Sequence, residues 1–307
     1  MLAARPAASA QGAELTDEVV GEPVTDLLSE GLVLGREAEL HAGLFTIRPV
    51  PGRLHGEVAI VTGSTSGLGR EIARLFAAEG AAVTVTGRDA GRGETVATSI
   101  RDSGDEAAFF AADLTDEQQC GALVESVVDR FGSLTVLVNN AVRSDGGGGG
   151  TVVDVQAETW EAVLRVNVVA AASLCRFAIP RMLDAGHGSI VNVSSRAAEL
   201  GTPGQSAYSA SKGALNALTR SIAMDFGRRG IRCNTVQPGY VLHERRDAGL
   251  TEERRQQLEE MHLTRLATAT DVARACVFLA GPDAEVITGI TLPVDGGSTA
   301  VRGRSLG

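Results

Sequence analysis

The fold is decided by one stretch, residues 58–69, which reads VAIVTGSTSGLG. Its first four residues are an apolar run typical of a buried strand. Apolar residues then recur at positions 68, 72, 75 and 76, as on one face of a helix, and Gly80 ends that pattern. A glycine turn between a strand and a helix N-terminus binds phosphate through backbone N–H groups and the helix dipole. The stretch therefore predicts a nucleotide-binding βαβ unit. Its expected cofactor contacts are Gly63, Ser64, Thr65, Ser66, Gly67, Leu68 and Gly69.

The rest of the chain repeats the alternation of strand and helix. Strand-like runs follow at residues 82–86, 107–111, 134–138, 190–193, 231–236 and 290–294, with helical patterns between them, the longest from about residue 157 to 183. This alternation predicts an α/β fold, a single doubly wound parallel sheet of Rossmann type flanked by helices. Ligands of such sheets bind beyond the carboxyl ends of the strands. The residues at or just after those ends should therefore converge: Gly63, Arg88, Asp113, Asn139, Ser195 and Pro238.

A second group of residues has the chemistry of proton transfer. Tyr208 and Lys212 are four residues apart, which places them one turn apart on a helix face. A nearby cation favours the phenolate, so Lys212 is expected to pull the pKa of Tyr208 below its usual value of about 10. Ser195 lies thirteen residues before Tyr208 (208 − 195) and offers a hydroxyl for a substrate oxygen. The spacing of Tyr208 and Lys212 alone is also found in ordinary helices.

With these motifs together, the sequence resembles the short-chain dehydrogenase/reductase family, and within it the 3-oxoacyl-carrier-protein reductases. The motifs that match lie in family order from about residue 55 to 300: the glycine turn, Asp113-Leu114, Asn139-Asn140-Ala141, Asn167, Ser195, Tyr208, Lys212, Pro238-Gly239 and Asp295-Gly296-Gly297. Two positions depart from the pattern. Val142 replaces the glycine that ends the Asn-Asn-Ala-Gly motif, and His243 replaces a frequent threonine. The His243 change puts cofactor contacts and lid closure in doubt, but not the four catalytic positions.

The resemblance implies a catalytic tetrad of Asn167, Ser195, Tyr208 and Lys212. Tyr208 would be the general acid or base, Ser195 would steady the substrate oxygen, and Lys212 would also bind the nicotinamide ribose. Asn167 would hold a water that links Lys212 to solvent. Ser194 is the alternative to Ser195, and the family offset to the tyrosine favours Ser195. Beyond the glycine turn, the expected cofactor contacts are Arg88, Asp113, Leu114, Asn140, Ala141, Tyr208, Lys212, Pro238, Gly239 and Val241.

The choice of cofactor depends on the end of the second strand. An NAD site usually has an acidic residue there, but this chain has Gly87 followed by Arg88. A guanidinium suits a 2′-phosphate, so NADP(H) is the expected cofactor, with NAD(H) as the alternative. Asp89 could instead pair with Arg88 as a surface ion pair.

Composition narrows the class of partner. The chain has 307 residues and a net charge of −10, which disfavours nucleic acid and anionic membranes as partners. The four cysteines are dispersed without metal-ligand spacing, and we expect no metal. The apolar stretch at 163–179 contains Arg165, Asn167 and Arg176, which favours a buried helix over a membrane span. No secretory signal is evident at the start, so we expect a cytoplasmic enzyme that acts on a small carbonyl or alcohol as a homodimer or homotetramer.

Three segments are less certain in role. Residues 1–54 form an expected N-terminal extension, either a disordered tail or an arm that contacts other subunits, ahead of a catalytic domain at 55–307. Residues 146–150 are five glycines, either a surface connection or a mobile rim of the substrate pocket. Residues 243–266 are charged and hold the place of the family's substrate lid. His243 at its hinge is more readily a packing residue than a catalytic one.

Other functions on the same fold remain open at this point. A non-enzymatic dinucleotide sensor or scaffold usually lacks one member of the tetrad, whereas all four are present here. An epimerase or dehydratase would use the same Tyr and Lys, but usually has a different glycine turn and a longer C-terminal substrate domain. The reaction favoured is hydride transfer between a nicotinamide and a ketone or secondary alcohol.

Overall fold

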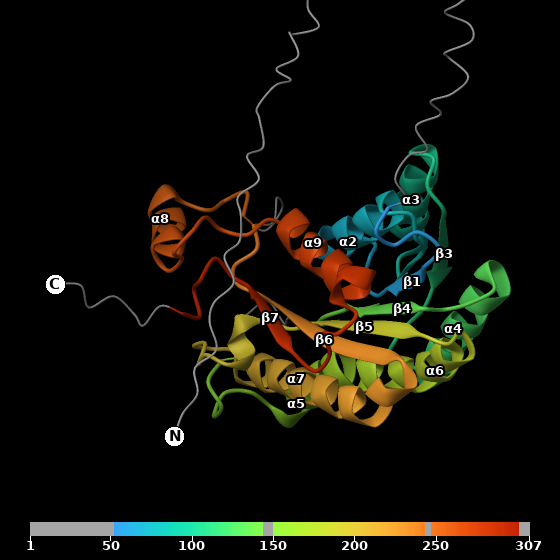
Figure 1. The fold of residues 1–307 in the computed structure, drawn as a ribbon. Helices are drawn as coiled ribbons and strands as arrows, with labels where there is room; N and C mark the ends of the chain where they lie inside the picture. Colours follow the sequence, from blue (N-terminus) through green and yellow to red (C-terminus); the bar gives the residue numbers. More distant parts are fainter. Residues whose placement is uncertain (1–51, 144–149, 243–246, 301–307) are drawn as a thin grey trace, which may run out of the picture. The chain divides into compact units, whose positions relative to one another are not determined.

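The computed structural model describes residues 52–143, 150–242 and 247–300. They form a seven-stranded, all-parallel sheet in the order β3-β2-β1-β4-β5-β6-β7 (Figure 1). The strands are β1 Val58–Val61, β2 Ala82–Gly87, β3 Ala107–Ala111, β4 Val136–Asn139, β5 Gly188–Val193, β6 Ile231–Pro238 and β7 Thr291–Val294. Each strand-like run of the sequence is one of these strands, with ends that differ by one or two residues. The predicted fold class, a doubly wound parallel sheet of Rossmann type, is confirmed.

Helices cover both faces of the sheet (Figure 1). The first apolar core lies under α2, α3 and α9, and the second lies under α4, α6 and α7. The helices are α2 Gly67–Ala78, α3 Ala90–Asp102, α4 Glu117–Phe131, α5 Ala157–Leu164, α6 Ala170–Asp184, α7 Ser206–Phe226, α8 Glu252–Glu260 and α9 Ala269–Ala280. Strands buried on both faces read as continuous apolar runs, which is why residues 58–61 lack a polar alternation.

The long helical pattern is a continuous helix with a defect in its middle. Helices α5 and α6 are joined by a π-helical turn at Arg165–Val169, which contains Asn167. By length and hydropathy the span Ala157–Asp184 could cross a membrane, and 44% of the apolar window is buried inside the protein. Seven residues of α6 are buried, and five of them belong to the core that α6 shares with α4. The stretch is thus packed here as a core helix.

The residues just before β1 pack against the α/β domain. By contacts the chain divides into residues 1–49 and 50–307. Leu54 is fully buried in the core beside α2 and α9, and its N–H donates to the carbonyl of Glu79 at 2.9 Å. Arg53 pairs with the carboxylate of the same Glu79. Arg53 and Leu54, which the sequence analysis assigns to the N-terminal extension, thus pack against the α/β domain. The predicted arm up to residue 51, glycines 146–149 and His243 lie outside the described residues.

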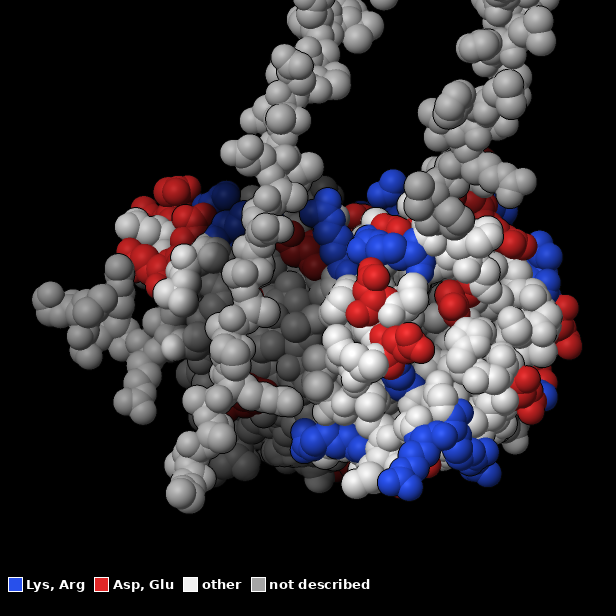
Figure 2. Space-filling model, in the orientation of Figure 1, with Lys and Arg blue, Asp and Glu red and all other residues white. Residues whose placement is uncertain are grey.

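Cysteines and surface charge agree with a reduced, mixed-charge protein. All four cysteines are buried and none forms a disulfide. Figure 2 shows acidic and basic side chains intermingled on the face in view. In the lid region, helix α8 carries alternating charges, and one i,i+4 ion pair joins Arg255 to Glu259. Only residues 247–266 of the predicted lid are described, and they contain this helix.

Candidate active site

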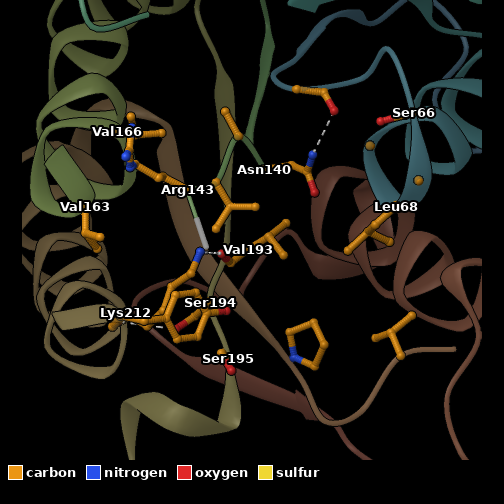
Figure 3. A pocket seen from close by; sticks show the side chains of 18 of the residues that line it. Ser66, Leu68, Asn140, Arg143, Val163, Val166, Val193, Ser194, Ser195 and Lys212 are labelled. Atoms are coloured by element: carbon orange, nitrogen blue, oxygen red, sulfur yellow. Dashed lines mark hydrogen bonds between the residues drawn. The ribbon is translucent and has the colours of Figure 1, made fainter. Parts of the chain in front are cut away.

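A cleft of about 1380 Å³ opens at the carboxyl ends of the strands. This exceeds the roughly 300–1,000 Å³ of most small-ligand pockets, so it has room for a dinucleotide and a substrate together. The predicted residues that line it are Gly63, Thr65, Ser66, Gly67, Leu68, Gly69, Arg88, Asp113, Leu114, Asn140, Ala141, Ser195, Tyr208, Lys212, Pro238, Gly239 and Val241. Residues from seven parts of the sequence thus meet in one place. Figure 3 shows Ser66 and Leu68 on one side of the cleft, with Ser195 and Lys212 across from them.

The glycine turn is shaped by close contact with the end of β4. A Cβ atom on Gly69 would come within 2.4 Å of both the Asn140 amide nitrogen and the Gly63 carbonyl oxygen, so only glycine fits. The Asn140 side chain donates to the carbonyl of Thr62 at 2.8 Å. The Thr62 hydroxyl in turn accepts the backbone N–H groups of Asn140 and Ala141, at 2.8 and 2.9 Å. This mutual bracing fixes the turn beside the N-terminus of α2.

The turn is a suitable place for the phosphates of a dinucleotide. Helix α2 starts at Gly67 and has no side-chain cap on its first N–H groups, so they face the cleft unsatisfied by the protein. The helix dipole adds partial positive charge at the same point. Because no side chain fills this cradle, the residues present fit a pyrophosphate.

Ser64, which the sequence analysis places among the cofactor contacts, is buried and does not line the cleft. Its hydroxyl is fully buried, donates to the Val61 carbonyl at 2.6 Å and accepts from the Thr86 N–H at 3.0 Å. Its backbone N–H also bonds to the Thr86 carbonyl. Ser64 therefore ties the turn to β2 and does not line the cleft.

The far end of the cleft has no acidic residue at the end of β2. A Cβ atom on Gly87 would lie 2.7 Å from the Thr65 methyl group, so Thr65 occupies the space that a longer side chain would need. The alternative pairing of Asp89 with Arg88 is not seen. Asp89 caps α3 through the Arg92 N–H at 3.0 Å and pairs with Nε of Arg92 at 2.7 Å. The exposed guanidinium of Arg88 thus stands in the cleft wall, near Asp113 but without a hydrogen bond or close ion pair among the described residues.

Asp113 stands near Arg88 in this wall. Its carboxylate accepts two hydrogen bonds from Thr115, from the backbone N–H and the hydroxyl. These bonds, more than the charge of Arg88, lower the pKa of Asp113, so it is ionised at neutral pH.

The reactive end is formed by helix α7 and the segment after β5. Tyr208 is partly buried, and its phenol lies beside the hydroxyl of Ser195. Burial raises the pKa of Tyr208, and the neighbouring Ser195 hydroxyl opposes the rise. The expectation that Lys212 pulls this pKa toward neutral is therefore wrong for the protein alone. At neutral pH the phenol is protonated and ready to donate.

Lys212 is held away from the phenol oxygen by the sheet. Its Nζ donates to the carbonyl oxygen of Val193, the last residue of β5, at 2.8 Å and lies 5.7 Å from the centre of the Tyr208 ring. Burial lowers the pKa of the Lys212 ammonium to about 8. This cation is therefore still mostly charged at pH 7, next to the acid that must lose a proton.

Of the two neighbouring serines, only Ser195 faces the phenol. The hydroxyl of Ser194 is buried and bonds to the carbonyl of Lys212 at 3.3 Å, which joins β5 to α7. The Ser195 oxygen accepts the N–H of Ala197 at 3.2 Å, so its own hydrogen is left for another acceptor. The geometry favours Ser195 for a substrate contact.

Asn167 lies behind the cleft wall and braces it. Its side chain accepts from the Arg143 N–H at 2.8 Å and donates to the Ser211 hydroxyl at 3.0 Å. Ser211 in turn donates to the carbonyl of Tyr208 at 2.6 Å. The π-helical turn aims Asn167 at both segments, as such turns often do at functional sites. Asn139, at the end of β4, points inward and donates to Asn192 at 2.8 Å.

Sequence reasoning missed several residues of the site. Thr62 and Val193 hold the glycine turn and Lys212 through contacts that only the fold reveals. Arg143, Arg196, Thr202 and Gln205 also line the reactive end. Arg196 directly follows Ser195, so its position could have been noticed. Among the described residues no cluster of His, Cys, Asp and Glu side chains could hold a metal ion.

Comparisons with known proteins agree with this geometry. A family model described as "Enoyl-(Acyl carrier protein) reductase" matches residues 63–299. The chain is 40% identical over 245 residues to the cis-4-hydroxycyclohexanecarboxylate dehydrogenase of Sinomonas cyclohexanicum, a match that covers 80% of this chain and 97% of that one. It is 35% identical over 241 residues to the 3-oxoacyl-(acyl-carrier-protein) reductase FabG of Staphylococcus aureus, covering 78% and 96% of the two chains.

A solved structure has the same arrangement. The gluconate 5-dehydrogenase of Burkholderia cenocepacia, solved with NADP and tartrate, superposes with a TM-score of 0.75 and 31% sequence identity. The match covers 81% of this chain and 98% of that one.

Proposed function

Since the chain belongs to the short-chain dehydrogenase/reductase family, we propose that Tyr208 is the acid–base group of its reaction and that Ser195, Lys212 and Asn167 support it. The protein is an NAD(P)-dependent oxidoreductase that acts on a ketone or a secondary alcohol. The observation that carries the assignment is that Tyr208, Ser195 and Lys212 line one cleft together with the glycine turn. A sensor or scaffold would not need this proton donor.

Proton transfer follows from the state of the phenol. When bound, the reduced nicotinamide supplies the hydride that adds to the carbonyl carbon. Tyr208 gives its proton to the carbonyl oxygen, and in alcohol oxidation the same oxygen takes the proton back. The Ser195 hydroxyl donates to the substrate oxygen and steadies its developing negative charge. The charge of Lys212 opposes the cost of leaving a phenolate in a buried site.

Asn167 is a positioning residue. It is 2% exposed and reaches the tyrosine only through Ser211, whose hydroxyl bonds to the Tyr208 carbonyl. It also fixes the backbone of Arg143, which follows β4 in the cleft wall. Asn167 thus holds α7 and the end of β4 in register. It would also bind the water that the family resemblance implies, which links Lys212 to solvent.

NADP(H) is the preferred cofactor, with NAD(H) as the alternative. Two features of the chain support this choice. Thr65 fills the space beside Gly87, where an NAD site places a carboxylate, and Arg88 is available to a 2′-phosphate. The adenine would lie by Asp113 and Leu114, the pyrophosphate by Gly67 and Leu68, and the nicotinamide by Pro238, Gly239 and Val241.

The assembly that we propose is a homodimer or homotetramer. Val169 of the π-helical turn is 44% exposed and Met224 of α7 is 84% exposed. Large apolar side chains exposed on long helices can be covered by another subunit. We also propose a cytoplasmic setting, which the four buried cysteines without disulfides support.

The test is a coupled substrate and cofactor screen. Purified protein is mixed with NADPH or NADH and a panel of ketones that includes 3-oxoacyl thioesters, cyclic ketones and sugar-derived ketones, and loss of absorbance of the reduced cofactor is followed. We expect turnover of at least one ketone, faster with NADPH. Tight binding of NADPH without turnover of any ketone or alcohol would instead favour a sensor.

A further inference from the structure

Arg196 differs from the other partly buried arginines of the described chain. Three arginines have this intermediate exposure: Arg181, Arg196 and Arg232. Arg181 pairs with Glu125 at 2.7 Å, and Arg232 donates to three backbone carbonyls, at 2.6 to 3.2 Å. The guanidinium of Arg196 has no hydrogen bond or ion pair within residues 52–143, 150–242 and 247–300. A guanidinium that lines a cleft without a protein partner is available to an anionic ligand, which points to a partner supplied by a ligand.

No carboxylate lines the cleft beside Arg196 among the described residues. It directly follows Ser195 in the short 3₁₀ turn at Arg196–Ala198 and lines the reactive end of the cleft. Among the described lining residues the only carboxylates are Asp89 and Asp113, and both stand at the other end, near Arg88. The chain as a whole carries a net charge of −10. The reactive end is therefore a cationic region in an acidic protein.

The cofactor phosphates do not account for this cation. Their site is the glycine turn and Arg88, and Figure 3 places Ser66 and Leu68 across the cleft from Ser195. The remaining molecule that enters the reactive end is the substrate. We propose that Arg196 binds a carboxylate of the substrate, so that the enzyme acts on a hydroxy acid or an oxo acid. The planar guanidinium fork matches a carboxylate with two parallel hydrogen bonds.

The position of Arg196 also limits the size of the substrate. Consecutive Cα atoms are about 3.8 Å apart, so Ser195 and the long side chain of Arg196 can reach one small molecule, even though the extended backbone at Ser195 separates the directions of the two side chains. Ser195 contacts the reacting oxygen, and Arg196 must reach a carboxylate on the same molecule. The substrate is therefore a compact acid, with its hydroxyl or ketone a few bonds from the carboxylate. A neutral ketone or a long thioester would leave the guanidinium unpaired.

The experiment compares a charged substrate with its neutral counterpart. It rests on the proposed function and uses the full chain with NADP⁺ and NAD⁺. The probes are cis-4-hydroxycyclohexanecarboxylate, the compact acid named for one relative, and the corresponding carboxamide. We expect the kcat/KM of wild type for the carboxylate to be at least about tenfold higher than its kcat/KM for the carboxamide. The reason is that a hydrogen bond to a charged group contributes more binding free energy than one to a neutral group.

Three variants locate the effect. Arg196→Gln should raise KM for the carboxylate about tenfold or more and leave the carboxamide within about twofold. Arg196→Lys keeps the positive charge but lacks the planar guanidinium, so its KM for the carboxylate should lie between the values of wild type and Arg196→Gln. Arg274→Gln on α9 removes an exposed charge outside the cleft and should match wild type for both probes. Equal use of the two probes by wild type, or equal slowing of both by Arg196→Gln, would overturn the proposal.

Failure of this inference is separable from failure of the proposed function. Turnover of neutral ketones without preference for the acid leaves the oxidoreductase intact and removes the role of Arg196. If nothing is turned over, titration calorimetry of the carboxylate into the NADP⁺-loaded protein decides. Binding that Arg196→Gln abolishes supports the anion site, and absence of binding to wild type overturns it.

Discussion

Nζ of Lys212 lies 2.8 Å from the carbonyl oxygen of Val193, so the amine of helix α7 is anchored to the end of strand β5. Its burial lowers the pKa of Lys212 to about 8. The ammonium form therefore exists below about pH 8 and is lost above it. Because the charge steadies the phenolate that forms on Tyr208, kcat/KM for ketone reduction should fall as the pH rises through about 8.

The pH profile of Lys212→Arg checks this assignment. Arginine stays charged at all accessible pH values, so whatever activity the variant keeps should not decline near pH 8. Steady-state rates from pH 6 to 10 with saturating NADPH give both profiles. A wild-type rate that stays flat to pH 10 would contradict the role of Lys212.

Replacing Tyr208 with Phe removes the proton donor and little else. We expect kcat to fall by more than about 10²-fold, as is usual for loss of a general acid. NADPH should bind nearly as tightly as in wild type, because the phenol is remote from the pyrophosphate site. Cofactor fluorescence measures the binding, and near-normal kcat in the variant would refute the mechanism.

Arg88→Ala should change cofactor choice. KM for NADPH is expected to rise about tenfold or more, while KM for NADH stays nearly constant, because only NADPH carries the 2′-phosphate. Arg70→Ala is the matched control, since Arg70 is exposed on α2 and outside the cleft. The assignment is wrong if wild type uses NADH at least as well as NADPH. It is also wrong if Arg88→Ala leaves the ratio of the KM values for NADPH and NADH unchanged.

The oligomeric state is tested by light scattering at micromolar concentration. We expect two or four times the mass of one chain. Met224→Glu places a charge on an exposed apolar position of α7 and should lower the mass without unfolding the subunit. A wild-type monomer would refute the assembly that we propose.

The sequence was sufficient for the architecture because its rules are local. Strands buried on both faces need apolar runs, and the turn between β1 and α2 needs glycine at position 69, so both can be read directly. The sequence also predicted which strand ends lie near one another, because the carboxyl ends of parallel strands meet at one edge of the sheet. The packing of the residues just before β1 was harder to predict, because the contact of Leu54 with Glu79 joins residues 25 positions apart (79 − 54).

The site was less predictable where burial decides the chemistry. Helical spacing places Tyr208 and Lys212 on one face, but it does not show that the amine bonds to Val193 or that the phenol is desolvated. For that reason the direction of the pKa shift of Tyr208 was wrong. The burial of Ser64 was hidden in the same way, since a motif does not reveal which hydroxyl points inward. Arg196 has no motif, and only the lack of a partner in three dimensions distinguishes it.

The π-helical turn at Arg165–Val169 has a consequence for how this chain tolerates insertions and deletions. Each residue of an α-helix turns the chain by about 100°. Deleting one residue within this turn would restore a regular helix, but it would rotate either Asn167 away from Ser211 or Leu174 out of the core beside α4. The helical register before the turn places Asn167 at the active site, and the register after the turn places Leu174 in the core. Length changes should therefore be harmful here, whereas they are tolerated in exposed loops.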